Sequence, residues 1–168
     1  MGKKNIYLIG FMGAGKSSIA QQLRRQLGYP VVEMDERIVK EQGMSINDIF
    51  AKYGEDAFRN METALIQTLG KEDASIVSCG GGVVVRPQNV EYMKKSGIIV
   101  YLTATPETIY ERVHNSTDRP ILNGHMNVEY IAQLMEKRRV LYEGAADLQV
   151  ATDGKTYAQI CEEILAEL

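Results

Sequence analysis

The sequence predicts one α/β domain, a three-layer sandwich in which a central five-stranded parallel sheet has helices on both faces. At 168 residues the chain is long enough for one hydrophobic core and short for two. Short apolar runs rich in β-formers alternate along it with longer segments of helical period. The segments between the runs are long enough for crossover helices, and such crossovers join parallel strands.

Each predicted strand is a short apolar run bounded by glycine, proline or polar residues. The five runs are residues 6–9, 30–34, 75–79, 97–102 and 148–151. The carboxyl ends of parallel strands share one edge of the sheet, so we expect ligands to bind along that edge.

The predicted helices follow from apolar spacing and from capping residues. Ile19 and Leu23 share one face of a helix over residues 16–27, and Gly28 stands at its C-cap position. Ser45, with an acidic residue at the N3 position, starts another helix. Further helices are predicted at residues 55–69, 88–95, 106–114, 128–142 and 157–168.

Composition and charge exclude several classes of function. The net charge is -3, so no excess of cations favours a nucleic acid or an anionic membrane. No apolar segment approaches the ~20 residues that span a bilayer, and the first apolar run is too short for a signal peptide. Cys79 and Cys161 lack metal-ligand spacing and are expected to be reduced structural thiols. We therefore expect a cytoplasmic monomer with no nucleic-acid or membrane partner.

The stretch GFMGAGKSS follows the first strand and precedes the first helix. It contains Gly10-x-x-x-x-Gly15-Lys16-Ser17, the pattern of a phosphate-binding loop. Glycine lets backbone amides approach phosphates closely, and the helix that follows offers unpaired N–H groups and a positive dipole end. Lys16 is expected to reach the β and γ phosphates of a nucleoside triphosphate, and Ser17 to bind Mg²⁺. The predicted nucleotide-binding residues are Gly13, Ala14, Gly15, Lys16, Ser17 and Ser18.

Two carboxylates follow the second strand. Alternation along a strand places Glu33 and Asp35 on one face, beside the phosphate loop. One could hold Mg²⁺, through water, and the other could accept a proton or a hydrogen bond from an acceptor hydroxyl. The alternative is that they only cap a helix that starts at Glu36, since Asp is a favoured N-cap residue.

Three consecutive glycines, Gly80, Gly81 and Gly82, come directly after the third strand. They cost backbone entropy and contribute no packing, so something must approach the main chain there. Their amides could bind the hydroxyls or the carboxylate of an acceptor. Arg59 and Arg138 lie on predicted helices, and the sequence around each alone favours a solvated surface arginine.

The sequence HNSTDRPILNGH, which starts at residue 114, is polar, rich in turn formers and flanked by helices. We predict a mobile lid over about residues 112–126 that carries Arg119 to the transferring phosphoryl group and excludes water. A chain of this size has room for a nucleotide site, an acceptor site and a lid. It therefore favours a phosphoryl-transfer enzyme over a switch or a motor.

Several segments together resemble shikimate kinases. They are GFMGAGKSS, Met34-Asp35, Ala57-Phe58-Arg59-x-x-Glu62, Gly80-Gly81-Gly82, Arg119-Pro120-x-Leu122 and Arg138-x-x-Leu141-Tyr142, in this order over nearly the whole chain. The resemblance implies one P-loop NTPase domain over residues 1–168, like that of nucleoside-monophosphate kinases, with an acceptor-binding helical segment at about residues 35–62. It also implies transfer of the γ-phosphate of ATP to the 3-hydroxyl of shikimate, in chorismate and aromatic amino-acid biosynthesis.

The resemblance also assigns roles to residues. Asp35 would contact the acceptor hydroxyl, Arg59 and Arg138 would hold the carboxylate, and the backbone of the three glycines would complete the acceptor site. Arg119 would be the lid arginine on the phosphates. These roles make Lys16, Asp35 and Arg119 the predicted catalytic residues.

Two positions depart from the family pattern. Glu33 stands where members of the family often have Asp. Its side chain is one methylene longer and should still reach a magnesium-bound water. Ser17 and Glu33 are therefore the predicted metal-binding residues. Some members place an arginine against the adenine near the C-terminus, and Lys155 is the predicted counterpart here. A solvent-facing turn lysine is the alternative for Lys155.

Three other functions fit part of the sequence. A kinase for another small hydroxy acid, such as gluconate, shares the loop and the size but has less use for three glycines and two carboxylate-binding arginines. A catalytically silent nucleotide-binding module would need only the loop. A GTPase switch would need Asn-Lys-x-Asp to bind guanine, and the sequence lacks it.

Overall fold

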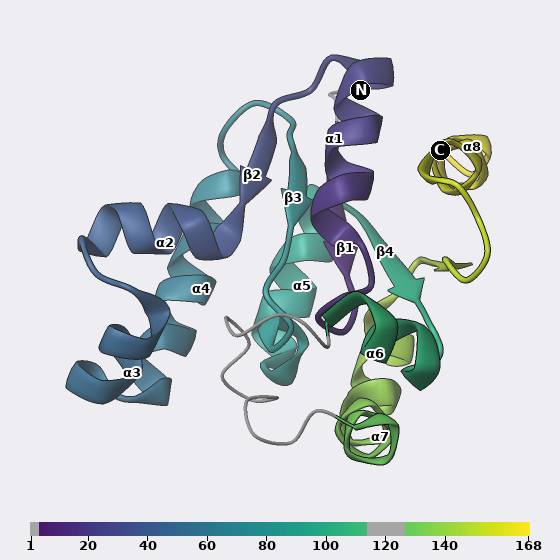
Figure 1. The fold of residues 1–168 in the computed structure, drawn as a ribbon. Coiled ribbons are helices and arrows are strands. Elements are labelled where there is room, and N and C mark those ends of the chain that lie inside the picture. Colours follow the sequence, from purple (N-terminus) through teal and green to yellow (C-terminus); the bar gives the residue numbers. More distant parts are fainter. Residues whose placement is uncertain (1–3, 114–126) are drawn as a thin grey trace.

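The computed structural model describes residues 4–113 and 127–168. Its five strands form one sheet in the order β2-β3-β1-β4-β5, and every neighbouring pair is parallel (Figure 1). The strands are β1 (Asn5–Ile9), β2 (Val31–Glu33), β3 (Ile76–Ser78), β4 (Gly97–Thr103) and β5 (Leu148–Ala151). The predicted fold class is therefore confirmed.

Helices connect the strands. They are α1 (Lys16–Leu27), α2 (Met34–Gln42), α3 (Ile46–Tyr53), α4 (Glu55–Leu69), α5 (Pro87–Ser96), α6 (Pro106–Val113), α7 (Val128–Ala145) and α8 (Tyr157–Ala166), with a 3₁₀ turn η1 (Val83–Val85). Gly28 caps α1 in the left-handed region at φ 74°. Ser45 Oγ accepts a hydrogen bond from the Asp48 N–H at 3.1 Å. Both predicted caps are confirmed.

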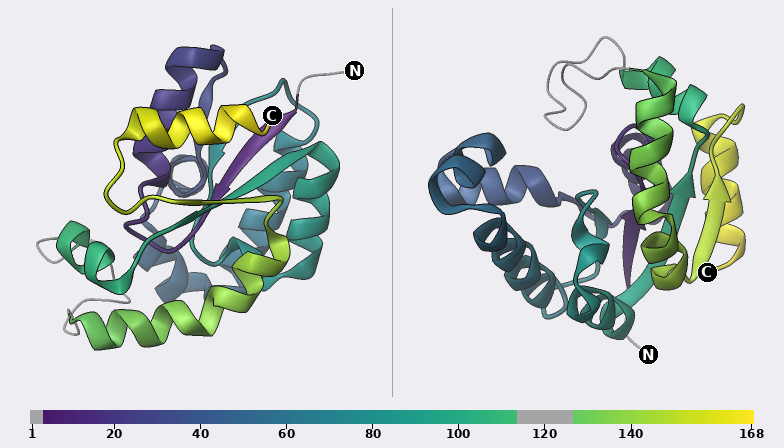
Figure 2. Two further views of the ribbon diagram at one scale, coloured as in Figure 1. Left: turned by 90° about the vertical axis from the view of Figure 1, so that its right-hand side faces the viewer. Right: turned by 90° about the horizontal axis from the view of Figure 1, so that it is seen from below.

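The sheet has a hydrophobic core on each face. Side chains of β1 alternate between the two: Ile6 and Leu8 belong to one core, and Tyr7 and Ile9 belong to the other. Helices α1 and α8 cover the first face, and α4 and α5 cover the second (Figure 2). Because β1 is buried on both faces, the loop at its carboxyl end starts from a rigid base.

The junction of β2 and α2 differs from the prediction. β2 ends at Glu33 and α2 begins at Met34, so Glu33 is the N-cap residue and Asp35 lies in the first helical turn. The expected strand alternation of Glu33 and Asp35 is therefore wrong, and so is the N-cap position of Asp35. Met34 is fully buried, and burying its side chain favours an early helix start. Glu33 makes no side-chain capping hydrogen bond, which argues against capping as its role.

The turn η1 was not predicted, because three consecutive valines have a strand-like composition.

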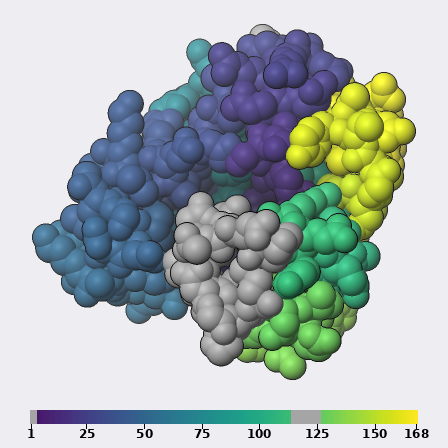
Figure 3. Space-filling view, viewed as in Figure 1, coloured from purple at the N-terminus to yellow at the C-terminus, as the bar shows by residue number. Residues whose placement is uncertain are grey.

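Helices α2, α3 and α4 form a lobe on one side of the molecule, coloured blue in Figure 3. This lobe contains the segment that was predicted to bind the acceptor.

Within the described ranges, no helix combines the length and the apolar character that a bilayer span requires. Cys79 and Cys161 are buried and free, as expected.

Candidate active site

The phosphate loop, residues 10–17, joins β1 to α1 at the carboxyl edge of the sheet. Gly13 and Gly15 have φ values of 81° and 97°, which favour glycine. Gly15 is the N-cap residue of α1 and has no side chain with which to cap the helix. The first turn of such a helix presents backbone N–H groups that can bind a phosphate.

Lys16 folds back over this loop. Its ammonium group donates to the carbonyl oxygens of Gly10, at 2.6 Å, and Phe11, at 3.2 Å. The charge therefore lies over the loop whose amides were predicted to bind phosphate. A nucleotide phosphate oxygen is a stronger partner for an ammonium group than a neutral carbonyl.

The two predicted metal residues lie side by side. Ser17 Oγ donates to Glu33 Oε2 at 3.0 Å, although the two residues come from α1 and the end of β2. Both are hard oxygen donors of the kind that Mg²⁺ prefers. In the described part of the chain, no three His, Cys, Asp or Glu side chains gather into a metal cage. The pair therefore fits Mg²⁺ that takes most of its ligands from water and phosphate.

The three glycines after β3, which we call the glycine triplet, lie against the predicted acceptor residues. A Cβ on Gly80 would lie 2.9 Å from Asp35 Oδ1 and 3.0 Å from Glu62 Oε2. One on Gly81 would lie 3.2 Å from Arg138 Nη1. None of the three glycines has a positive φ. Their missing side chains therefore serve close approach and not an unusual backbone conformation.

Arg59 packs most tightly of all against this triplet. A Cβ on Gly82 would lie 2.6 Å from Arg59 Cζ, so the guanidinium occupies the space of the missing side chain. Arg59 also forms an ion pair with Glu62 at 2.7 Å and one with Glu55 at 3.2 Å. Its side chain is only 12% exposed, so the surface alternative is wrong for Arg59.

Glu62 is a functional candidate to which the sequence reasoning assigned no role. It is fully buried, and its Oε2 atom has no hydrogen-bond partner in the described structure. Burial raises the pKa of Glu62, although the nearby charge of Arg59 acts in the opposite direction. Burial is the largest single influence on Arg59 and acts to lower its pKa, but the charges and hydrogen bonds of Glu62 and Glu55 together raise it. The spacing Arg59-x-x-Glu62 on one helix face was the available signal.

Helix α7 brings Arg138 and Tyr142 to the middle glycine of the triplet. The Tyr142 hydroxyl donates to the Gly81 carbonyl at 2.6 Å, and its ring stacks on Tyr101 at 5.0 Å between centroids. Burial raises the pKa of Tyr142, so it stays protonated and donates. Arg139, one residue after Arg138, points elsewhere and pairs with surface glutamates of its own helix.

Arg112 is a second residue that the sequence reasoning missed. From α6, its Nη1 donates to the Gly13 carbonyl at 2.9 Å and to Thr152 Oγ1 at 3.3 Å. It therefore joins the phosphate loop to the turn after β5. Its partners are 99 and 40 positions away in the sequence, so no local pattern identifies it.

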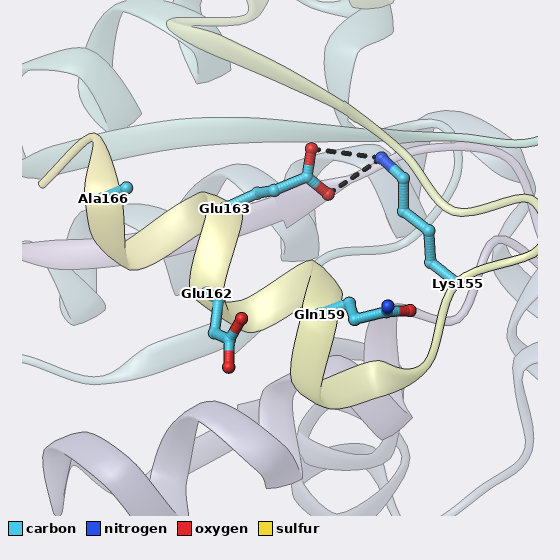
Figure 4. A pocket seen from close by; sticks show the side chains of 5 residues that line it. All are labelled: Lys155, Gln159, Glu162, Glu163 and Ala166. Atoms are coloured by element: carbon cyan, nitrogen blue, oxygen red, sulfur yellow. Dashed lines mark hydrogen bonds and ion pairs between the residues drawn. The ribbon is translucent and has the colours of Figure 1, made fainter.

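Lys155 and Arg119 were both predicted to contact the nucleotide. Lys155 lies in the turn before α8, where its ammonium group pairs with Glu163 at 2.8 Å. Figure 4 shows both side chains lining a hollow with Gln159, Glu162 and Ala166. A contact of Lys155 with nucleotide stays a prediction. Arg119 and residues 114–126 of the lid predicted at about 112–126 lie outside the described residues.

This chain is similar to known shikimate kinases in sequence and in fold. Residues 12–168 match the family model described as shikimate kinase. A shikimate kinase of Dehalococcoides mccartyi is 43% identical over 162 residues, which cover 96% of this chain and 92% of that protein. The solved structure of a shikimate kinase from Acinetobacter baumannii in complex with shikimate superposes with a TM-score of 0.90 at 32% identity, covering 98% of this chain and 92% of that one.

A gluconokinase from Sinorhizobium meliloti 1021 is more distant. It matches with a TM-score of 0.59 at 20% identity, over 97% of this chain and 90% of its own. At this level the likeness shows a common fold and carries no inference about substrate.

Proposed function

The chain belongs to the shikimate kinase family, and on that basis we propose that it transfers the γ-phosphoryl group of ATP to the 3-hydroxyl of shikimate. ATP is the phosphate donor of this family. The reaction gives shikimate 3-phosphate, in chorismate and aromatic amino-acid biosynthesis. We further propose that the enzyme acts as a cytoplasmic monomer.

One observation supports this function most directly: Asp35, Arg59 and Arg138 all pack against the glycine triplet. They come from three separate helices, so their convergence is a property of the fold. Two guanidinium groups beside a carboxylate suit an acceptor that carries both a carboxylate and hydroxyl groups. A planar guanidinium binds a carboxylate in a bidentate manner.

On the acceptor side, Arg59 and Arg138 bind the shikimate carboxylate and so fix the orientation of the ring. Asp35 accepts a hydrogen bond from the reacting hydroxyl and so directs the hydroxyl oxygen toward the γ-phosphorus. Main-chain amides of the glycine triplet complete the acceptor site. Glu62 holds Arg59 in place through their 2.7 Å ion pair.

On the donor side, amides of the phosphate loop and Lys16 hold the β and γ phosphates, and Ser18 lies at the same helix end. Ser17 and Glu33 would hold Mg²⁺, which neutralises charge on the phosphate oxygens when it is bound. Arg112 keeps the loop in position through the Gly13 carbonyl. Arg119 is the lid cation in this proposal, and Lys155 contacts the nucleotide.

A coupled assay of ADP release tests the proposal. We expect ADP release that depends on shikimate and on Mg²⁺, and none with gluconate in place of shikimate. Release with gluconate but not with shikimate would support the other sugar-acid kinase. ATP binding without acceptor-dependent release would support a silent nucleotide-binding module.

A further inference from the structure

Asn89 is a buried polar residue that the proposed mechanism does not use. It lies in α5, is 0% exposed and makes two side-chain hydrogen bonds. Its Nδ2 donates to the Val83 carbonyl at 2.9 Å, and its Oδ1 accepts from Thr63 Oγ1 at 2.7 Å. The carbonyl can only accept, so this geometry fixes the orientation of the amide. Asn89 thus joins η1 to α4.

The two ends of this connection lie next to the acceptor site. Val83 directly follows Gly82, the residue on which the Arg59 guanidinium packs. Thr63 lies one helical turn after Arg59, and its hydroxyl is 3.0 Å from the Arg59 carbonyl oxygen. Asn89 therefore connects the residue that follows Gly82 to a residue one helical turn from Arg59.

A second connection lies at the other end of η1. Arg86 follows η1 directly, and its Nη1 donates to Asn60 Oδ1 at 2.8 Å. It also approaches Thr63 Oγ1 at 3.4 Å. Asn60 is the neighbour of Arg59 on α4. The turn after the glycine triplet is thus attached to α4 at its beginning and at its end.

We propose that Asn89 and Thr63 form a brace that sets the distance between the glycine triplet and α4, and that they are positioning residues for recognition of the acceptor carboxylate. This inference rests on the proposed function. The Arg59 guanidinium has almost no free space over Gly82, so a small separation of η1 from α4 lets it turn. A less ordered guanidinium binds a carboxylate more weakly, because binding must then order it.

Asn5 provides a matched control for the loss of stability. It is 3% exposed, and its Nδ2 donates to the Leu69 carbonyl at 3.1 Å and to Tyr7 at 2.9 Å. It is therefore also a buried asparagine attached to α4. Its Oδ1 also accepts from the Ser75 N–H at 2.8 Å, before β3 begins. These contacts lie at the end of α4 away from Arg59 and at the end of β3 away from the glycine triplet, so its loss should destabilise the fold and leave the triplet in place.

The test measures KM for shikimate, KM for ATP, kcat and Tm for Asn89→Leu, Thr63→Val, Thr63→Ser and Asn5→Leu. For Asn89→Leu and Thr63→Val we expect KM for shikimate to rise about tenfold, which corresponds to about 1.4 kcal/mol. We expect KM for ATP to change less than about twofold, which is under about 0.5 kcal/mol. Thr63→Ser, which keeps the hydroxyl, and Asn5→Leu should both retain the KM for shikimate of the wild type.

Three outcomes would overturn the brace. The first is an unchanged KM for shikimate in Thr63→Val. This result alone would contradict the brace even if Asn89→Leu does not fold. The second is an equal rise of both KM values, and the third is a comparable rise in Asn5→Leu. Absence of shikimate-dependent ADP release in the wild type would instead overturn the proposed function and the brace with it.

Discussion

Replacing Gly82 with alanine tests whether the glycine triplet is there to admit the Arg59 guanidinium. Gly82 has φ -97° and ψ 6°, which an L residue can adopt. The added methyl group therefore meets little backbone strain, and its effect comes from contact with Arg59. Any loss of function then reports on the position of the guanidinium.

The size of the effect follows from the contact distance. The new Cβ would lie 2.6 Å from Arg59 Cζ, while ordinary contact begins at 3.4 Å. The guanidinium of Arg59 already forms ion pairs with Glu62, at 2.7 Å, and with Glu55, at 3.2 Å. It must break these ion pairs in order to move away from the new methyl group. A displacement of about 1 Å at a positioning group can cost about 100-fold in rate.

We therefore expect Gly82→Ala to lower kcat/KM for shikimate by about 10- to 100-fold and to leave KM for ATP within about twofold. Steady-state ADP release, measured with each substrate varied in turn, gives both quantities. Gly81→Ala should have a smaller effect, because its Cβ would lie 3.2 Å from Arg138 Nη1, a weaker overlap than the 2.6 Å at Gly82.

Gly144→Ala is the matched control. Gly144 lies in α7, and a Cβ there would have no heavy atom within 4 Å. Its replacement should stabilise the helix by about 0.5–1 kcal/mol and leave both KM values unchanged. If Gly82→Ala kept the kcat/KM for shikimate of the wild type, close packing of Arg59 would not be the reason for glycine at this position.

Three further predictions test other parts of the site. Asp35→Asn should lower kcat by about 100-fold or more at unchanged KM for ATP, and full turnover on shikimate would contradict the acceptor role of Asp35. Arg112→Ala removes the contacts to Gly13 and Thr152. KM for ATP should therefore rise about fivefold, which corresponds to about 1 kcal/mol, while KM for shikimate stays constant. A rise in both KM values would contradict this role of Arg112. Burial raises the pKa of Glu62 above its ordinary value of 4.5. Between pH 4.5 and the pKa of Glu62 in the folded state, the folded protein therefore binds more protons than the unfolded chain. The contribution of Glu62 to the free energy of unfolding falls as pH rises through this range. Denaturant unfolding at pH 4.5–8 should show wild type losing stability relative to Glu62→Gln as pH rises, and a difference independent of pH would refute the shift.

The sequence by itself determined the parts of this protein that depend on local chemistry. Strand runs, helical periods, the caps at Gly28 and Ser45 and the phosphate loop each depend on residues within a few positions of one another. Steric and hydrogen-bonding preferences at this range act in the same way in most folds. They were therefore predictable without knowledge of the tertiary structure.

Only the tertiary structure decided which side chains meet. The sequence placed Asp35 on a strand or at a cap, whereas burial of Met34 puts it inside a helix. The residues around Arg59 alone favoured a surface position, and only the family resemblance predicted a place for it in the acceptor site; the structure packs it over Gly82. The sequence reasoning assigned no role to Glu62 or Arg112. Contacts of this kind join residues from different elements and depend on how the core packs, so no local pattern specifies them.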